Sequence, residues 1–305
     1  MSDRHFLPVG INSQPWPLLP PKVAGELDFQ SLAPIYLYPM QIATWNVNSI
    51  RSRQSQVVAW LRENSVDVLC IQETKVVDGD FPSAPFLELG YHCQFSGQKA
   101  YNGVAILSRQ PLREVTCGFM PLLGAQQVGE WDQQKRIITG VYQGIHIINV
   151  YVPNGAEVAG DKYAYKLAWL GLLKTYLSQC LQEPAVPLCL CGDFNIALED
   201  RDIYNPQGKE THIMASPAER LALKEILGLG LEDVFRKFES KSGHFSWWDY
   251  RAAGFAKNRG WRIDHIYLSK TLYAEAQSCR IDSVPRGWPK PSDHAPVVVT
   301  LERGY

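Results

Sequence analysis

Polar and acidic residues stand at the ends of several apolar runs in this sequence. Seven of them have side chains that bind metals or move protons: Asn46, Asn48, Glu73, Asp193, Asn195, Asp293 and His294. A single carboxylate at the end of a strand is usually only a solvated cap. Strand ends that open onto loops are, however, where α/β proteins gather their sites, and the recurrence in one chain predicts a shared site.

Glu73 follows the apolar run VLCIQ and precedes Thr74 and Lys75. A carboxylate that emerges from a core in this way is a hard oxygen ligand. Magnesium and manganese prefer such oxygen ligands to sulfur or to several imidazoles. Glu73 is therefore a candidate metal ligand, and a salt bridge to Lys75 is the alternative role.

The segment CGDFN places a carboxylate and an amide two residues apart. On an extended segment Asp193 and Asn195 project to the same side, and Gly192 permits a close approach of the backbone. One of these two side chains can accept a proton while the other donates a hydrogen bond. The pair is therefore suited to acid–base chemistry.

A second carboxylate and an imidazole occur near the C-terminus, in RIDH and SDH. His294 can bind a phosphate oxygen as a cation or donate to it as a neutral imidazole. Asp264 can hold that imidazole in orientation, as carboxylates do for catalytic histidines. His265 is interpreted as structural, because the alternation of a strand sends it to the opposite face from Asp264.

These groups need a scaffold of strands, and strand-like segments recur from Met40 onward. Eight are expected at residues 41–46, 66–73, 103–108, 136–142, 145–151, 186–195, 262–269 and 294–301. Helical periods occupy residues 51–64 and 162–183, and a capping box of Ser216 and Glu219, with Pro217 between them, begins a third helix. This pattern predicts an α/β fold in which mixed sheets are sandwiched between helices. We expect one domain over residues 40–305, after a proline-rich N-terminal extension over residues 1–39.

The composition excludes several classes of protein. The 305-residue chain is 46% hydrophobic and 20% charged, which excludes disordered, collagenous and coiled-coil proteins. No apolar run approaches the roughly 18 residues of a membrane span, and no signal peptide is recognisable. The seven cysteines, mostly in apolar runs, predict reduced, buried thiols in a cytosolic protein. A net charge of −1 gives no general basic field, so any phosphate-rich partner must be bound by local clusters of cations.

The motifs together carry a family resemblance. WNVNSIR, IQETK, YVPNG, GDFN, FSWWDYR, NRGWRID and SDH occur in this order over residues 40–303. The chain resembles exonuclease III, in the AP endonuclease branch of the endonuclease/exonuclease/phosphatase superfamily. The resemblance implies a single-domain, four-layer αββα sandwich with the site at one end of its two sheets.

The resemblance also implies roles for particular residues. Glu73 becomes the principal ligand of Mg²⁺ or Mn²⁺, with Asn46 and Asn48 close to the metal and Asp293 as a further metal ligand. Asp193 activates water or protonates the leaving oxygen, Asn195 orients Asp193, Tyr151 contacts the phosphate, and His294, oriented by Asp264, binds a phosphate oxygen. Lys99 is expected to bind substrate as one of the local cations that support a phosphate backbone. The substrate-binding residues that the resemblance implies are Arg136, Asn154, Trp247, Trp261 and Ile263. Of these, Arg136 is a backbone clamp, and the last three form a pocket for an extruded abasic sugar.

The implied function is a metal-dependent phosphodiesterase of DNA repair. It cleaves duplex DNA 5′ to abasic sites, with 3′ to 5′ exonuclease and 3′ phosphodiesterase activity, and we expect a cytoplasmic monomer, associated with the nucleoid in a bacterium. Flat aromatic faces beside arginines in FSWWDYR and NRGWRID favour nucleic acid. The sequence leaves open whether Trp248 lies in the pocket or in the core.

Two alternatives compete with this function. Enzymes that hydrolyse phosphoinositides, sphingomyelin or poly(A) share the GDFN and SDH chemistry. A catalytically silent DNA-binding module is a hypothesis of another class. It predicts the loss of one or more of Glu73, Asp193, Asp264 and His294, and all four are present.

Overall fold

The computed structural model describes residues 37–182, 187–209 and 211–304. Residues 1–36, which make up nearly all of the predicted proline-rich extension, lie outside the described residues. The first strand begins at Leu37, before the expected residue 41, because residues 37–41 pair with residues 300–304 of the last strand. Residues 37–304 are described below by themselves.

Two six-stranded sheets form the centre of this part of the chain. The first sheet contains, in spatial order, β11 (Ala276–Ile281), β12 (Val297–Gly304), β1 (Leu37–Asn46), β2 (Val68–Gln72), β4 (Val104–Ser108) and β3 (His92–Ser96). The second contains β5 (Arg113–Cys117), β6 (Ile137–Tyr142), β7 (Ile145–Tyr151), β8 (Leu188–Asp193), β10 (Asp264–Ser269) and β9 (Leu231–Asp233). Both sheets are mixed, since β1 pairs with β2 in parallel and β7 with β8 in parallel, whereas the other pairs are antiparallel.

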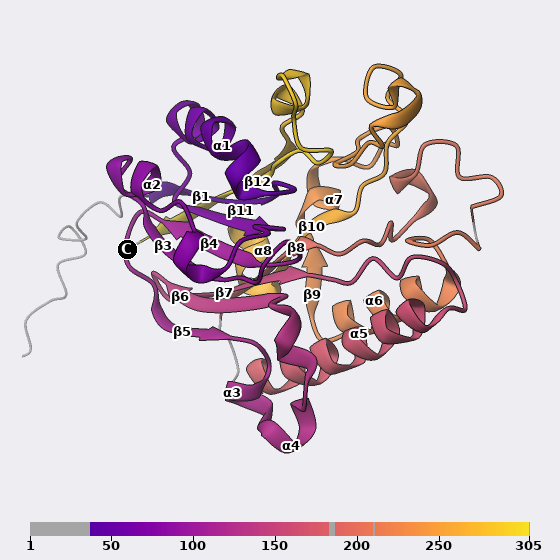
Figure 1. Cartoon of the computed structure of the whole chain (residues 1–305), viewed down its shortest axis with the longest axis horizontal. Helices are drawn as coiled ribbons and strands as arrows, with labels where there is room; N and C mark the ends of the chain where they lie inside the picture. Colours follow the sequence, from indigo (N-terminus) through magenta and orange to yellow (C-terminus); the bar gives the residue numbers. More distant parts are fainter. Residues whose placement is uncertain (1–36, 183–186, 210, 305) are drawn as a thin grey trace, which may run out of the picture. The chain divides into compact units, whose positions relative to one another are not determined.

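Helices cover the outer faces of both sheets (Figure 1). The helices of the described residues are α1 (Ile50–Asn64), α2 (Ala84–Glu88), α3 (Met120–Leu123), α4 (Ala125–Val128), α5 (Asp161–Cys180), α6 (Pro217–Leu227), α7 (Val234–Phe238) and α8 (Lys270–Glu275). Of these, α7 and α8 place their buried side chains in the cluster between the sheets instead. Short 3₁₀ turns occur at Asp78–Asp80, Trp131–Gln134, Asp200–Asp202, Arg251–Ala253 and Val284–Gly287. The predicted helices match α1, α5 and α6, and α6 begins with the expected capping box of Ser216 and Glu219.

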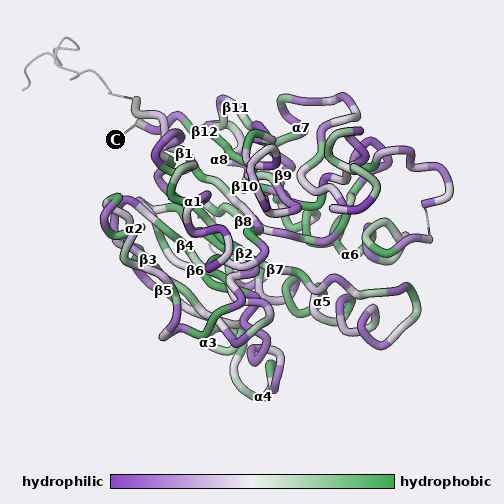
Figure 2. Tube along the Cα trace, turned by 45° about the horizontal axis from the view of Figure 1, so that its top comes forward, coloured by the Kyte–Doolittle hydropathy of each residue, from purple (hydrophilic) through white to green (hydrophobic). Residues whose placement is uncertain are grey.

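Three apolar layers hold the four layers of structure together. Between the sheets, side chains such as Ile42 and Ile147 pack in one cluster. Val57 of α1 packs with the outer face of the first sheet, and Leu173 of α5 packs with the outer face of the second. Figure 2 shows hydrophobic residues (green) concentrated along the strands and hydrophilic residues (purple) along many outer loops. The predicted αββα sandwich is confirmed.

The topology brings the ends of selected strands together. Parallel pairing puts the carboxyl ends of β1 and β2, where Asn46 and Glu73 lie, side by side. The same holds for Tyr151 and Asp193 at the ends of β7 and β8. Asp264 pairs with Asp193 in register, because β10 begins where its antiparallel neighbour β8 ends. The fold therefore gathers the predicted groups from both sheets at one end of the sandwich.

The cysteine prediction is correct in part. Cys70, Cys189, Cys191 and Cys279 are buried free thiols, but Cys117 is exposed. Cys117 differs because it lies on β5, an edge strand whose residues mostly face solvent. Among the described helices, none is both long enough and apolar enough to cross a bilayer.

Candidate active site

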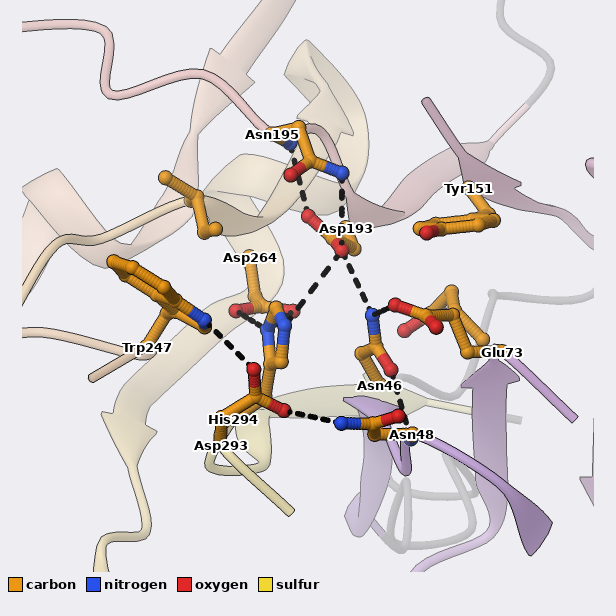
Figure 3. Close-up of polar contacts among 12 residues, drawn as sticks. Asn46, Asn48, Glu73, Tyr151, Asp193, Asn195, Trp247, Asp264, Asp293 and His294 are labelled. Atoms are coloured by element: carbon orange, nitrogen blue, oxygen red, sulfur yellow. Dashed lines mark hydrogen bonds and ion pairs between the residues drawn. The ribbon is translucent and has the colours of Figure 1, made fainter. Parts of the chain in front are cut away.

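Asn46 connects the acidic groups of the two sheets (Figure 3). Its Nδ2 donates to Oε1 of Glu73 at 2.9 Å and to Oδ2 of Asp193 at 2.8 Å. Its Oδ1 accepts the backbone N–H of Asn48 at 2.9 Å. The expected place of Asn46 close to a metal stays a prediction. Its amide nitrogen links two carboxylates that come from different sheets.

Asp193 is buried and is held by both neighbouring amides. Its Oδ1 accepts the backbone N–H of Asn195 at 2.9 Å, and its Oδ2 accepts Nδ2 of Asn195 at 3.2 Å. Burial raises the pKa of Asp193 far above that of an ordinary carboxyl, while the charge of His294 opposes this shift. A carboxyl with a raised pKa can both take and return a proton near neutral pH.

Gly192 explains how β8 reaches this position. Its φ is 147°, and a Cβ at this residue would lie only 1.9 Å from the backbone oxygen of Val150 on β7. The sequence-based expectation of a close backbone approach at Gly192 is thus confirmed. A glycine is needed here for Asp193 to emerge beside Tyr151.

His294 is oriented by Asp264, as expected from the sequence. Its Nδ1 lies 2.9 Å from Oδ2 of Asp264, and its Nε2 lies 3.9 Å from Oδ2 of Asp193. Burial lowers the pKa of His294, but the charges of Asp264 and Asp193 outweigh burial, and the net pKa is raised. The imidazole is therefore a cation in the neutral range, with Nε2 facing the other site groups.

The loop that carries His294 is tied to the first sheet. The hydroxyl of Ser292 donates to the backbone oxygen of Asn46 at 2.7 Å and accepts the backbone N–H of His294 at 3.2 Å. Nε1 of Trp45 donates to the backbone oxygen of His294 at 3.2 Å. These contacts place an imidazole from the end of the chain against the carboxyl ends of β1 and β2.

Glu73 forms the salt bridge to Lys75 that the sequence offered as its alternative role. Its Oε2 forms an ion pair with Nζ of Lys75 at 2.7 Å. Its carboxylate also belongs, with Asp193 and His294, to a group whose ligand atoms lie within 4.8 Å of one another. Burial opposes the ionisation of Glu73, but Lys75 and Asn46 outweigh it and lower the pKa. Two carboxylates at this separation fit a hard divalent cation.

Asn48 and Asp293, both expected near the metal, are joined to each other. Nδ2 of Asn48 donates to Oδ1 of Asp293 at 2.9 Å, and Oδ2 of Asp293 accepts Nε1 of Trp247 at 3.0 Å. Each carboxylate oxygen of Asp293 thus accepts one hydrogen bond and keeps a further lone pair. Oδ1 of Asn48 accepts Nζ of Lys75 at 2.5 Å. Lys75 therefore links Asn48 to Glu73, and the expected place of Asn48 and Asp293 near a metal stays a prediction.

A cavity of about 570 Å³ opens in front of these groups. The predicted residues that line it are Glu73, Tyr151, Asn154, Asp193, Asn195, Trp247, Trp261, Asp293 and His294. Six further residues complete the lining: Lys209, His212, Met214, Asp249, Arg251 and Arg259. Three come from an aperiodic loop, which has no pattern to reveal them. Asp249 and Arg251 stand in FSWWDYR and Arg259 stands in NRGWRID, where the aromatic residues and the arginines, but not Asp249, indicated nucleic acid.

The aromatic residues separate into wall and core. Trp247 and Trp261 line the cavity and exchange two backbone hydrogen bonds of 2.9 Å, so they stand opposite each other. Ile263 does not line the cavity, because it is buried behind Trp261 in a small apolar cluster. Trp248 is core, since its ring is buried and packs edge-on against Phe255 at 5.2 Å.

The remaining predicted substrate residues occupy different places. The guanidinium of Arg136 lies 4.7 Å from the ring centre of Tyr151, and its Nη1 donates to the backbone oxygen of Tyr151 at 3.2 Å, so its role as a clamp stays a prediction. Nδ2 of Asn154 donates to Oδ1 of Asn195 at 2.9 Å. Lys99 is exposed and does not line the cavity.

Tyr151 lies where it can meet a substrate. It lines the cavity with Glu73 and Asp193. Burial, followed by the charges of these two carboxylates, raises its pKa well above the usual value. The hydroxyl therefore stays protonated and can donate a hydrogen bond.

Comparisons with known proteins agree with this geometry. Residues 43–294 match the model of the endonuclease/exonuclease/phosphatase family. Exodeoxyribonuclease III of Haemophilus influenzae is 34% identical over 270 residues, covering 85% of this chain and 98% of that protein. An AP endonuclease from Archaeoglobus fulgidus has a TM-score of 0.81 and 40% identity, with 86% of this chain and 99% of that chain covered. A 3′ phosphatase from Neisseria, solved with a product DNA hairpin, has a TM-score of 0.82 and 38% identity, with 87% of this chain and 100% of that chain covered. The chain belongs to the endonuclease/exonuclease/phosphatase family, in the branch of exonuclease III and the AP endonucleases.

Proposed function

We propose that this protein is a hydrolase of DNA repair that cleaves phosphodiesters in duplex DNA on the 5′ side of abasic sites. Removal of nucleotides and blocking groups from 3′ ends is the second expected activity. The observation that carries the proposal is the convergence of Glu73, Asp193 and the Asp264-held His294 in one cavity walled by two tryptophans.

The side chains of the site divide the work of hydrolysis. A water oxygen forms a bond to phosphorus, the bond to the leaving oxygen breaks, and that oxygen takes a proton. Asp193, held by two amides, is the group that takes a proton from water or gives one to the leaving oxygen. Protonated His294 and the hydroxyl of Tyr151 donate to the phosphate oxygens, where negative charge grows in the transition state.

Glu73 is the principal residue that would hold a divalent cation, because its carboxylate is ionised, whereas Asp193 with its raised pKa is kept for proton transfer. Magnesium or manganese is the metal that such a carboxylate favours. A bound ion supplies charge neutralisation at the phosphate. The ion pair between Glu73 and Lys75 keeps this carboxylate ionised and in place.

The walls of the cavity support nucleic acid as the substrate. Trp247 and Trp261 offer flat faces for an extruded sugar, and Lys209, Arg251 and Arg259 line the same cavity with positive charge. Extrusion costs less where base pairing is already lost, which favours abasic sites. We propose that the active form is a monomer. We further propose that the protein acts in the cytoplasm, with the nucleoid in a bacterium.

A panel of substrates tests this proposal. The protein with Mg²⁺ is incubated with a duplex oligonucleotide that contains one tetrahydrofuran site, with the intact duplex, with a phospholipid and with an inositol polyphosphate. We expect a cut 5′ to the tetrahydrofuran and no product from the phospholipid or the inositol polyphosphate. If the phospholipid or the inositol polyphosphate were hydrolysed while the DNA stayed uncut, the protein would belong to another branch of the family. Tight binding of the duplex without any cleavage would support the silent DNA-binding module.

A further inference from the structure

A wholly buried ion pair lies behind the loops that carry Asn154 and Asn195. Nζ of Lys166 on α5 lies 2.5 Å from Oε1 of Glu219 on α6, and both side chains are 0% exposed. Removing two charges from water is costly, and apolar side chains of similar size often stabilise a core equally well. Stability alone is therefore a poor explanation for this pair.

The ammonium of Lys166 uses its other donors on two site loops. Nζ donates to the backbone oxygen of Asn195 at 2.7 Å and to that of Asn154 at 3.2 Å. The side chains of the same two asparagines are bonded to each other. One buried cation thus joins the loop after β7 to the loop after β8.

The carboxylate of Glu219 holds a third segment of the cavity wall. It accepts the backbone N–H groups of Met214 and Ser216, each at 3.1 Å, and the hydroxyl of Ser216 at 2.7 Å. Met214 lines the cavity, and its backbone oxygen accepts the N–H of Ala197 at 2.7 Å. The pair therefore connects three loops that are far apart in sequence.

We propose that Lys166 and Glu219 are a positioning pair that sets the place of Asn195, and through Asn195 the place of Asp193. This inference rests on the proposed function of Asp193 in proton transfer. The backbone N–H and Nδ2 of Asn195 both donate to the carboxylate of Asp193. A shift of the Asn195 backbone therefore moves two groups that hold the catalytic carboxyl. A misplaced acid–base group slows the chemical step and leaves the binding surface largely intact.

The double variant Lys166→Met, Glu219→Gln tests the pair without leaving an unpaired buried charge. We expect a folded protein whose kcat on the tetrahydrofuran duplex falls about 10- to 100-fold, as for other supporting groups of a site, while KM changes less than about threefold. The matched control is Lys174→Met, Glu225→Gln. That pair joins the same two helices at 3.0 Å but is 42% and 49% exposed. We expect the control to keep the wild-type kcat.

Hydrogen exchange separates failure of the inference from failure of the proposed function. In the double variant, backbone amides of residues 193–197 and 214–216 should exchange faster than in the wild type and in the control. Unchanged kcat or unchanged exchange in a folded double variant would overturn the positioning role. An inactive wild type would refute the proposed function and leave the exchange result to decide the role of the pair. If the double variant does not fold, Glu219→Gln alone is measured, and an unchanged kcat there also overturns the role.

Discussion

Asp264 illustrates how one buried carboxylate acts through a neighbour. Its oxygens lie 2.9 and 3.1 Å from Nδ1 of His294, so it fixes the ring and favours the imidazolium. Asp264 is buried and pairs with Asp193 across the sheet, yet it does not line the cavity. Its contribution to catalysis must therefore pass through His294.

Replacement of Asp264 by Asn tests this dependence. An amide keeps the shape but removes the charge that holds His294 as a cation, so we expect kcat to fall about 10- to 100-fold with little change in the free energy of DNA binding. Single-turnover incision and a fluorescence titration with the uncleaved duplex measure the two quantities. A variant that bound DNA much more weakly but cut at the wild-type rate would contradict the role given to Asp264.

The catalytic residues can be recognised in the sequence because each lies where an apolar strand begins or ends. The strand pattern predicted a shared site for Glu73, Asp193 and His294, whereas the family resemblance implied that this site lies at one end of the two sheets. The pattern could not show that Asp293 is tied to Trp247 and Asn48, or that Arg136 lies against Tyr151. Such contacts depend on side-chain packing between segments that are distant in sequence.

At the scale of elements, the eight strands expected from the sequence are the inner strands of the two sheets. The four missing strands, β3, β5, β9 and β11, are the four sheet edges. Edge strands are paired on one side only and carry more polar side chains, as in the largely solvent-facing β5. They therefore lack the apolar pattern by which inner strands are recognised.

A buried charge cluster holds the segment Asp200–Asp202 against β10 and α7. Asp202 is buried and forms ion pairs with Arg236 and with Nε of Arg262, the latter at 2.7 Å. Nη2 of Arg262 also binds Asp233, which caps α7, at 2.7 Å. Burial raises the pKa of Asp202, but Arg262 and then Arg236 outweigh burial and hold it well below its usual range.

Asp202→Asn should lower the free energy of unfolding by about 3 kcal/mol at pH 7, because it leaves buried arginine charge less compensated. The folded pKa lies below the unfolded value of about 3.9, so the contribution of Asp202 is full above that pH. It is lost as the pH falls toward the folded pKa. Urea unfolding from pH 7 down to pH 3 measures the difference between the two proteins.

The control for this prediction is Asp200→Asn. Asp200 lies two residues away and pairs with Arg220 at 2.8 Å, but its side chain is 68% exposed. We expect a much smaller loss, because water screens an exposed pair. Two results would show that the cluster is not stabilised by ionised Asp202. In the first, Asp202→Asn lowers the free energy of unfolding no more than Asp200→Asn does. In the second, the effect of Asp202→Asn grows as the pH falls below 4.

At the scale of the whole molecule, a net charge of −1 provides no general attraction for DNA. The attraction must come from the cations around the cavity, among them Lys209, Arg251 and Arg259. Among the residues that the structure describes, Arg251 is paired with Asp249, whereas no ion pair engages Arg259. Arg259 is therefore the better candidate for a phosphate contact.

Arg259→Ala should weaken binding of the uncleaved duplex and reduce the slope of log K against log salt by about 0.9, the value for one lost phosphate contact. Lys174→Ala is the control, since Lys174 lies on α5 and does not line the cavity. Fluorescence anisotropy across a range of salt concentrations measures both slopes. An unchanged slope for Arg259→Ala would remove this arginine from the DNA interface.

The central claim is that groups from both sheets form a single hydrolytic centre with Asp193 as its acid–base group. The most direct measurement is the single-turnover rate of incision at one tetrahydrofuran site by wild type and Asp193→Asn, each with Mg²⁺ and with EDTA. We predict that EDTA abolishes incision by the wild type, and that Asp193→Asn, with unchanged folding and DNA affinity, is slower by about 10² to 10⁴. Incision by Asp193→Asn at the wild-type rate, or full incision by the wild type in EDTA, would contradict the account.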